Sequence, residues 1–436
     1  DREKPFDKMD KRLIEKVVTE QKEELAHLSQ KHFCTRREES LIDLNSKLAQ
    51  VIIGVRRSGK STLCYHVLKK AKVHFAYINF DDERLVSLQG SDLDSVLEVL
   101  YKIYGNFSCL FIDEIQNISE WFLFVNRLLR QEVRILVTGS NAKLLSGELA
   151  THLTGRYSQI ELYPFSFSEY CEYKHLDVQT LTTRNEGFIR EAFDEYLKKG
   201  GFPELFNEKN GTAYINTLVN SILTRDILTR YSIKYETAFT QIANHVLNNV
   251  PFKVSYKELQ NHFSLKSDHT VMNYVTYLKR AYLLAELHKY SAKSKIRVRD
   301  EKVYAIDVAL MNNRLNAFAG QNLGWRLESV VYLELLRRYR PLQYDIYYYS
   351  TSYTESDFVV CQGNQAKMIL QVSYDISNEK TRKRELMGLE AASRETRCET
   401  LLLITDHERE EVTFKEKKIR IVPAYEWLLE ENEVRE

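Results

Sequence analysis

One stretch constrains the fold of this chain more than any other, because residues 54–61 read G-x-x-x-x-G-K-S. An apolar run at residues 50–54 precedes it, and residues 62–68 have the composition of a helix. A strand, a glycine-rich turn and a helix in this order aim backbone amides and a helix N-terminus at phosphate oxygens. The two flanks disfavour a glycine-rich turn that matches by chance. The stretch therefore predicts a phosphate-binding loop in a parallel α/β domain.

Each residue type in this loop has a task in binding a nucleotide. The glycines let the backbone turn its amides inward, the Lys60 ammonium reaches the outer phosphates, and the Ser61 hydroxyl can ligate magnesium. We expect the nucleotide to contact these loop and helix residues: Gly54, Arg57, Ser58, Gly59, Lys60, Ser61 and Thr62. The loop therefore predicts ATP and Mg²⁺ as cofactors, with Lys60 also acting in catalysis.

Two carboxylates follow a second apolar run. Residues 109–113 read as a strand that ends in Asp113, and Glu114 comes next. Open parallel sheets bind their ligands at the carboxyl ends of the strands. We expect Asp113 to bind the nucleotide's magnesium through water, and Glu114 to polarise the water that attacks the terminal phosphate. An Asp-Glu pair alone would be an ordinary solvated turn, but together with the phosphate loop it predicts catalytic carboxylates.

The length and the strand–helix pattern divide the chain into four predicted segments. At 436 residues the chain exceeds one ordinary hydrophobic core. Residues 1–175 alternate apolar strands with helices, and residues 176–234 read as a helical lid. Residues 235–315 follow the order of a winged helix-turn-helix, and residues 316–436 read as a smaller α/β domain. The predicted fold class is therefore α/β, with a P-loop parallel sheet in the first segment.

Six motifs follow one another in the order that is typical of one protein family. They are the phosphate loop and residues 77–82, 111–116, 138–141, 154–156 and 163–169. With these motifs the chain resembles the archaeal-type AAA ATPases of bacteria and archaea, which end in a domain of unknown function. The resemblance implies an AAA core that hydrolyses ATP, a winged helix and a C-terminal domain similar to PD-(D/E)xK nucleases. It also leaves homo-oligomers open, although many relatives need not form rings.

The resemblance assigns roles to polar residues outside the loop. In AAA-type ATPases a polar residue after the strand at 134–138 senses the terminal phosphate, so we expect Ser140 or Asn141 to contact the nucleotide. The alternative is that the residue caps a helix. Arg156 is the candidate for the arginine that meets the transition-state charge, in cis or in trans. Arg225 is a weaker candidate, because a surface arginine on a helix is the alternative interpretation.

The last segment resembles PD-(D/E)xK nucleases in the order of its elements. Its candidate metal-site positions are Glu328, Asp357, Gln371 and Ser373. Metal-dependent cleavage needs carboxylates for a hard divalent cation and a lysine beside the attacking water. Gln371 and Ser373 stand where these nucleases carry glutamate and lysine, and Asp375 lies too far along the strand to substitute. We therefore predict a nuclease-like fold without nuclease activity.

Basic residues gather where the wing of the winged helix would lie. These residues are Lys289, Lys293, Lys295, Arg297 and Arg299. The predicted third helix is flanked by Lys266, Lys279 and Arg280, and its His269 and Asn273 would face base edges in a groove. DNA or RNA is thus a predicted partner. The alternatives are a winged helix that binds protein, and a basic strand edge that prevents aggregation.

Composition excludes several other classes of protein. The net charge of +1 favours neither nucleic acid nor a membrane surface as a global partner, so a polyanion needs a local basic patch. No apolar run approaches the roughly 20 residues that span a bilayer, which predicts a protein without a membrane partner. The six cysteines form no CxxC pair, as expected of reduced thiols in the cytoplasm. His245, His262 and His269 lack partners at zinc spacing.

Three functions are consistent with these motifs. The leading hypothesis is an AAA-type ATPase that hydrolyses Mg-ATP, moves the lid and the C-terminal segments, and so acts on a nucleic-acid or protein partner. The second is a nucleotide-gated binding switch with little turnover. The third is an ATP-dependent nuclease, which would require Glu328 and Asp357 to suffice for metal binding.

Overall fold

The computed structural model describes residues 11–28, 33–140, 153, 155–180, 182–291, 301–313 and 318–430. The chain divides into two compact units, one ending at Leu162 and one beginning at Tyr163. Among the described residues, no helix combines the length and the apolar character needed to cross a membrane.

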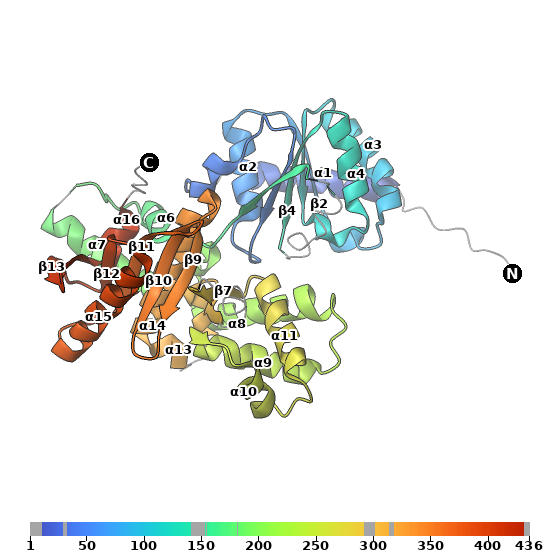
Figure 1. The fold of residues 1–436 in the computed structure, drawn as a ribbon. Helices are drawn as coiled ribbons and strands as arrows, with labels where there is room; N and C mark the ends of the chain where they lie inside the picture. Colours follow the sequence, from blue (N-terminus) through green and yellow to red (C-terminus); the bar gives the residue numbers. More distant parts are fainter. Residues whose placement is uncertain are drawn as a thin grey trace. The chain divides into compact units, whose positions relative to one another are not determined.

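The first unit is built on a sheet of five parallel strands in the order β2-β3-β4-β1-β5 (Figure 1). Its strands are β1 (Ala49–Ile53), β2 (Phe75–Asn79), β3 (Cys109–Asp113), β4 (Arg134–Gly139) and β5 (Tyr157–Glu161). Its α-helices are α1 (Lys11–Leu28), α2 (Lys60–Lys70), α3 (Leu93–Tyr104) and α4 (Trp121–Arg130). The predicted parallel α/β class is confirmed for this part of the chain.

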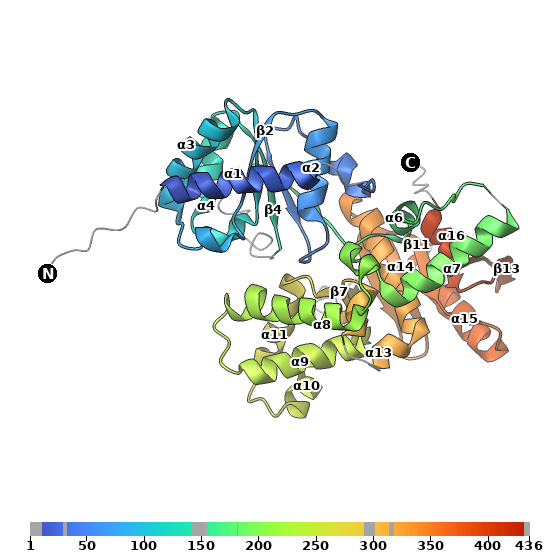
Figure 2. The same ribbon diagram turned by 180° about the vertical axis from the view of Figure 1, so that it is seen from behind.

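Burial on both faces explains why the central strands are continuously apolar. Every residue of β1 and β3 is buried, as parallel strands covered by helices require. On one face, Leu25 of α1 and Leu63 of α2 belong to the same core cluster as Phe111 of β3. Figure 2 shows α1 and α2 on this side, with α4 on the opposite face. The strand β3 thus carries its acidic residue, Asp113, at its carboxyl end.

The second unit contains one mixed sheet of nine strands, in the order β13-β14-β12-β11-β10-β9-β7-β8-β6. Its strands are β6 (Phe252–Lys253), β7 (Leu284–Lys289), β8 (Glu301–Ala305), β9 (Asp345–Ser350), β10 (Glu355–Gln362), β11 (Gln365–Val372), β12 (Leu401–Thr405), β13 (Glu410–Phe414) and β14 (Lys417–Pro423). Its α-helices are α6 (Phe167–Tyr173), α7 (Thr183–Lys199), α8 (Gly211–Ser221), α9 (Glu236–Asn249), α10 (Tyr256–His262), α11 (Asp268–Arg280), α13 (Phe318–Gln321), α14 (Leu323–Tyr339), α15 (Glu379–Thr396) and α16 (Ala424–Leu429).

Residues 236–305 follow the helix, helix, helix, strand, strand order expected from the sequence, with the short β6 after the first helix. Ser255 and Ser267 cap α10 and α11 by accepting hydrogen bonds from backbone amides. The two strands do not form a separate sheet, because β7 pairs in parallel with β9 at His288 and Tyr347. The segments predicted as a winged helix and as a nuclease-like domain therefore share one sheet.

The division between the units falls after Leu162, earlier than the expected boundary at residue 175. The reason is local: the Phe165 amide donates a hydrogen bond to the Gly201 carbonyl at 2.8 Å, which ties the start of this segment to the second unit. The segment expected as a lid is tied there as well. The Tyr196 hydroxyl of α7 donates to the Phe165 carbonyl at 2.7 Å, and Arg326 of α14 donates to the carbonyl of Leu197 at 3.0 Å.

Candidate functional site

The loop at residues 54–61 lies at the carboxyl end of β1 and leads directly into α2. Gly59, at φ 95°, occupies the left-handed region and precedes the first residue of the helix. A Cβ at Gly54 would lie 2.1 Å from the Leu162 carbonyl oxygen, so only glycine fits there. The backbone thus makes the predicted turn between strand and helix. The first amides of α2 lack intrahelical acceptors and are oriented along the helix axis.

Lys60 and Ser58 carry the polar groups at the centre of this loop. The buried Lys60 ammonium donates to the carbonyls of Gly54 and Val55 at 3.1 and 3.0 Å. The Ser58 hydroxyl oxygen is buried and has no hydrogen-bond partner among the described residues. An unsatisfied buried hydroxyl costs free energy unless a ligand or water binds it. These groups fit the phosphates of a nucleotide.

Arg36 supports the loop from outside the motif. Its guanidinium donates from Nη1 to the Ser58 carbonyl at 3.1 Å, and the side chain is buried. A Cβ at Gly59 would lie 3.5 Å from the same Nη1 atom. This contact could not be predicted from the sequence, because Arg36 lies 22 positions before Ser58 and belongs to no motif. The arginine adds positive charge close to the expected phosphate site.

Asp113 lies at the carboxyl end of β3, held by three hydroxyl groups. It accepts hydrogen bonds from Thr138 and, at 3.2 Å, from Tyr77, and its side chain also hydrogen-bonds with Ser61. Burial raises the pKa of Asp113, and the negative charge of Glu114 raises it further. The contact with Ser61 joins the two residues that were expected to hold magnesium.

Glu114 differs from Asp113 in the direction of its pKa shift. Burial opposes ionisation, but the positive charges of Lys60 and Arg56 lower the pKa of Glu114 below its ordinary value. Its Oε2 atom accepts hydrogen bonds from the Ser140 hydroxyl at 2.9 Å and from the Gln116 amide. An ionised carboxylate beside the phosphate loop can accept a proton from water.

Two predicted residues, Asn141 and Arg156, are not found at the phosphate loop in the described part of the chain. Asn141 belongs to the residues that the structure does not describe, whereas Ser140 contacts Glu114. Arg156 is exposed and precedes β5, whose first residue pairs with Ala49 at the start of β1. Arg156 therefore lies near the opposite end of β1 from the phosphate loop. A strand of five residues spans roughly 16 Å, which is beyond the reach of an arginine side chain. The structure therefore does not bring Arg156 to the phosphate loop of its own chain, and a role in trans stays a prediction.

Arg225 lies in the second unit, exposed on a π-helical segment at Ile222–Leu228. π-Helical turns are rare and are often found at functional sites. Its neighbour Asp226 is buried, and Arg230 lies 3.8 Å from the Asp226 carboxylate. No described contact gives Arg225 a catalytic partner within its own unit.

The four nuclease-like positions all lie around one cavity of the second unit. Glu328 of α14, Asp357 of β10, and Gln371 and Ser373 at the end of β11 line a cavity of 760 Å³. Lys302 of β8 also reaches this site, where its ammonium lies 2.6 Å from Glu328. This lysine was not among the predicted residues, because its strand belongs to the segment expected as a winged helix.

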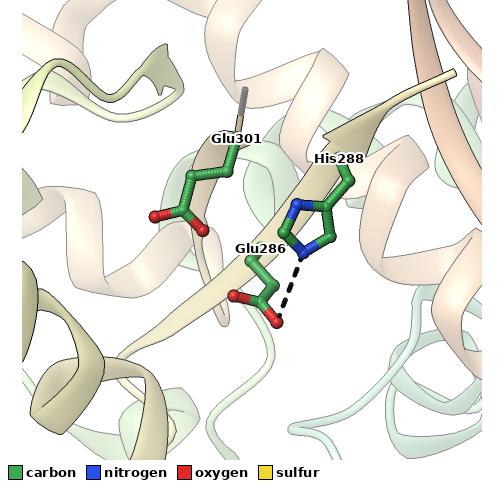
Figure 3. A group of neighbouring side chains, drawn as sticks. All are labelled: Glu286, His288 and Glu301. Carbon is green, nitrogen blue, oxygen red and sulfur yellow. Dashed lines mark ion pairs between the residues drawn. The ribbon is translucent and has the colours of Figure 1, made fainter. Parts of the chain in front are cut away.

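A second group of potential metal ligands lies on the ribbon formed by β7 and β8. Figure 3 shows Glu286, His288 and Glu301, whose ligand atoms all lie within 4.8 Å of one another. Strand register explains the group, since His288 is directly opposite Glu301 and Glu286 lies two residues earlier on the same face. The Lys279 ammonium contacts Glu286 and lies 3.0 Å from Glu301. Lys279, which was predicted to flank a nucleic-acid-binding helix, thus pairs with two carboxylates.

The predicted nucleic-acid residues are only partly described. His269 and Asn273 lie one turn apart on α11, with the Asn273 amide 3.3 Å from His269 Nδ1. Lys266 is exposed and Arg280 is half-buried, and neither has an ion-pair partner in the described part of the chain. Four predicted basic residues lie outside the described residues: Lys293, Lys295, Arg297 and Arg299.

Comparison with known proteins shows the family to which this chain belongs. A model described as an AAA domain matches residues 46–171, and models of two domains of unknown function match residues 190–321 and 323–427. The uncharacterised protein MJ1544 of Methanocaldococcus jannaschii is 33% identical over 395 residues, which cover 87% of this chain and 88% of that protein. The chain belongs to this family of AAA ATPases with a C-terminal domain of unknown function.

This AAA family includes bacterial members. An uncharacterised protein of Haemophilus influenzae is 30% identical over 342 residues, covering 75% of this chain and 82% of its own. Among solved structures, a Walker-type ATPase of Pyrococcus abyssi is 16% identical with a TM-score of 0.41, covering 65% of this chain and 96% of its own. The branch-migration motor RuvB of Thermotoga maritima is 14% identical with a TM-score of 0.28, covering 63% and 93%. Both structural likenesses are too distant to bear on function.

Proposed function

We propose that this AAA protein binds Mg-ATP at residues 54–61 and hydrolyses it with Glu114 as the general base. The observation that carries the proposal is the place of Glu114. It follows β3 directly, beside Asp113, which hydrogen-bonds with Ser61 of the loop, and the positive charges of Lys60 and Arg56 lower the pKa of Glu114. A carboxylate with a lowered pKa at the phosphate loop is suited to act as a general base.

Each group of residues has a separate role in the proposed hydrolysis. Gly54, Gly59 and the first amides of α2 would cradle the phosphates, and Lys60 would turn from the loop carbonyls towards them. Asp113 and Ser61 would hold Mg²⁺, which supplies positive charge to the phosphate oxygens. Glu114 orients the attacking water and accepts its proton, while Ser140 holds the carboxylate in place.

Steady-state phosphate release by purified protein tests the proposal. Lys60→Ala is expected to lose nucleotide binding and turnover together. Glu114→Gln keeps nearly the same shape but cannot accept a proton, so its turnover is expected to fall by about 100-fold or more while ATP binding remains. Glu132→Gln is the matched control, because this exposed glutamate lies outside the site. Unchanged turnover in Glu114→Gln would contradict the assigned base.

A binding switch with little turnover remains the second candidate, and one observation favours it. Glu114 Oε2 accepts hydrogen bonds from both Ser140 and Gln116, which restrains the carboxylate before any partner is bound. A restrained base would give slow hydrolysis until a partner rearranges the site. Tight ATP binding with no phosphate release, whether or not a partner is added, would support the switch over the ATPase.

We further propose that hydrolysis acts on a nucleic acid through α11 and its flanks. The helix order of residues 236–305 supports a winged helix, with His269 and Asn273 on α11. Lys266 and Arg280 have no carboxylate partner among the described residues, which leaves their charge for phosphates. The alternative partner is a protein bound by the same helix. Nuclease activity is not expected, because Gln371 and Ser373 do not supply the ligand and the lysine that cleavage requires.

A further inference from the structure

Two carboxylates in the cavity of the second unit are fixed by groups of the protein itself. Glu328 Oε1 accepts hydrogen bonds from Lys302 Nζ and from the Tyr304 hydroxyl, both at 2.6 Å. Asp357 Oδ2 accepts one from the Val372 amide at 2.8 Å. The second oxygen of each carboxylate has no hydrogen-bond partner in the part of the chain that the structure describes. Such an arrangement is what a hard cation would use.

Lys302 already supplies a positive charge beside Glu328 in this cavity. The lysine is buried on β8, and its ammonium also lies 4.0 Å from Glu355. Its Nζ atom lies 2.6 Å from Glu328 Oε1, the distance of a direct ion pair. A divalent cation would have to displace it or share the same carboxylates with it, and the like charges repel.

Gln371 cannot complete a metal site. Its Oε1 atom accepts a hydrogen bond from the Asp357 amide at 3.1 Å, and its Nε2 atom donates to Glu385 Oε2 at 2.6 Å. Glu385 is in turn paired with Arg384 at 2.5 Å. Both polar atoms of Gln371 are thus engaged by the protein. The groups around the cavity neutralise one another without an added cation.

We propose that the Lys302 ammonium takes the place of a divalent cation in this cavity, so that the native protein holds Glu328 and Asp357 together without metal. Replacing the ammonium with an apolar side chain would remove the cation that pairs with Glu328 next to the buried Asp357, and the two carboxylates would repel each other. Binding of Mn²⁺ would then relieve their repulsion. Lys302→Met therefore creates a metal site that the native chain lacks. The inference is independent of the proposed ATPase.

Thermal melting of the full chain, with and without millimolar Mn²⁺ and without nucleotide, tests the proposal. The Tm of the native protein and of Lys302→Met/Asp357→Asn should be insensitive to Mn²⁺. Lys302→Met should melt earlier than the native protein, and Mn²⁺ should raise its Tm by about 3 °C or more. Folded Lys302→Met with no such rise would overturn the proposal.

A second measurement applies even when Lys302→Met does not fold. Free Mn²⁺ is titrated by electron paramagnetic resonance in the presence of native protein and of Asp357→Asn, which keeps the shape of the side chain. The two proteins are expected to bind the same amount of Mn²⁺, because the cavity contributes no site in either. One equivalent bound by the native protein and lost in Asp357→Asn would show that the native cavity holds a metal, and the proposal would be wrong.

Discussion

Glu114 adopts an unfavourable backbone conformation, and the partial burial of its carboxylate disfavours charge. It adopts φ 52° and ψ 45°, the left-handed region that a non-glycine residue occupies at a cost of about 1–3 kcal/mol. Its carboxylate is half-buried next to the buried Asp113, and the positive charges of Lys60 and Arg56 lower the pKa of Glu114. Hydrogen bonds from Ser140 and Gln116 hold the carboxylate, and the Glu114 amide donates to the Thr138 hydroxyl oxygen at 3.2 Å. Strain of this kind is typical of catalytic positions, and it supports the role proposed for Glu114.

Removal of the Ser140 hydroxyl tests how the base is held. The hydrogen bond to Glu114 stabilises the charged carboxylate, so Ser140→Ala should raise the pKa of Glu114. The base is inactive once it is protonated, and a base with a higher pKa becomes protonated at a higher pH when the solution is acidified. The acid limb of the kcat profile is therefore expected to move up by about half a pH unit or more.

The control for this measurement is Ser87→Ala, at an exposed position in the same unit. Its profile should coincide with that of the native protein. A Ser140→Ala profile that only scales down, without a shift of the acid limb, would mean that Ser140 does not act through the charge of Glu114.

Residue patterns predicted the phosphate loop and the two carboxylates of the site, but not the residues from other segments that contact such groups. Residues 54–61, Asp113 and Glu114 could be located because glycines, a lysine and carboxylates follow apolar strands at fixed spacing. Arg36 and Lys302 could not, because their contacts join segments that are distant in sequence. Lys302, for example, meets Glu328 only because β8 joins the same unit as α14. Strand order and register in the tertiary fold decide such contacts.

At the scale of elements, the glycine pair after α7 anchors this helix within the second unit. The helix ends at Gly200, which adopts φ 81°. A Cβ there would lie 2.1 Å from Asp307 Oδ1, which accepts hydrogen bonds from the amides of Gly201 at 3.1 Å and Ala309 at 2.8 Å. Asp307 thus links the end of α7 to the segment that follows β8, and any side chain at Gly200 disturbs this link.

Gly200→Ala is therefore expected to destabilise the second unit by at least about 2 kcal/mol. Gly187→Ala is the matched control, because Gly187 lies in the middle of α7 with no atom within 4 Å of its added Cβ. Alanine there should stabilise the helix by about 0.5–1 kcal/mol. Chemical unfolding of both variants measures the difference. Equal stabilities would mean that the contact with Asp307 contributes nothing.

Helix and strand types were largely predictable, whereas their assembly was not. Apolar runs and capping serines located β1, β3, α10 and α11. The pairing of β7 with β9 could not be anticipated, because it is a parallel contact made by only the last residues of β7. That contact merges two predicted domains into one nine-stranded sheet.

For the whole molecule, the proposed nucleotide site belongs to the first compact unit, and α11 belongs to the second. If α11 contacts nucleic acid, duplex DNA or RNA should stimulate phosphate release by the native protein. Lys266→Ala/Arg280→Ala should weaken binding and lower its dependence on salt, because each lost phosphate contact reduces the slope by about one. Lys209→Ala, which removes an exposed lysine elsewhere in the unit, should change neither.

Fluorescence anisotropy with labelled oligonucleotides at several salt concentrations measures this binding. Equal salt slopes for the native protein and the double variant would remove α11 and its flanks from the interface. Stimulation by a protein and by no nucleic acid would favour the alternative partner.

The most direct test of the central claim is the nucleotide that remains on the protein after incubation with labelled ATP and magnesium, followed by rapid isolation and acid quench. The native protein should release ADP and phosphate, Glu114→Gln should yield intact bound ATP, and Lys60→Ala should retain no nucleotide. Native protein that is folded but retains and converts no ATP would contradict the assignment of residues 54–61 and Glu114 to an ATPase site.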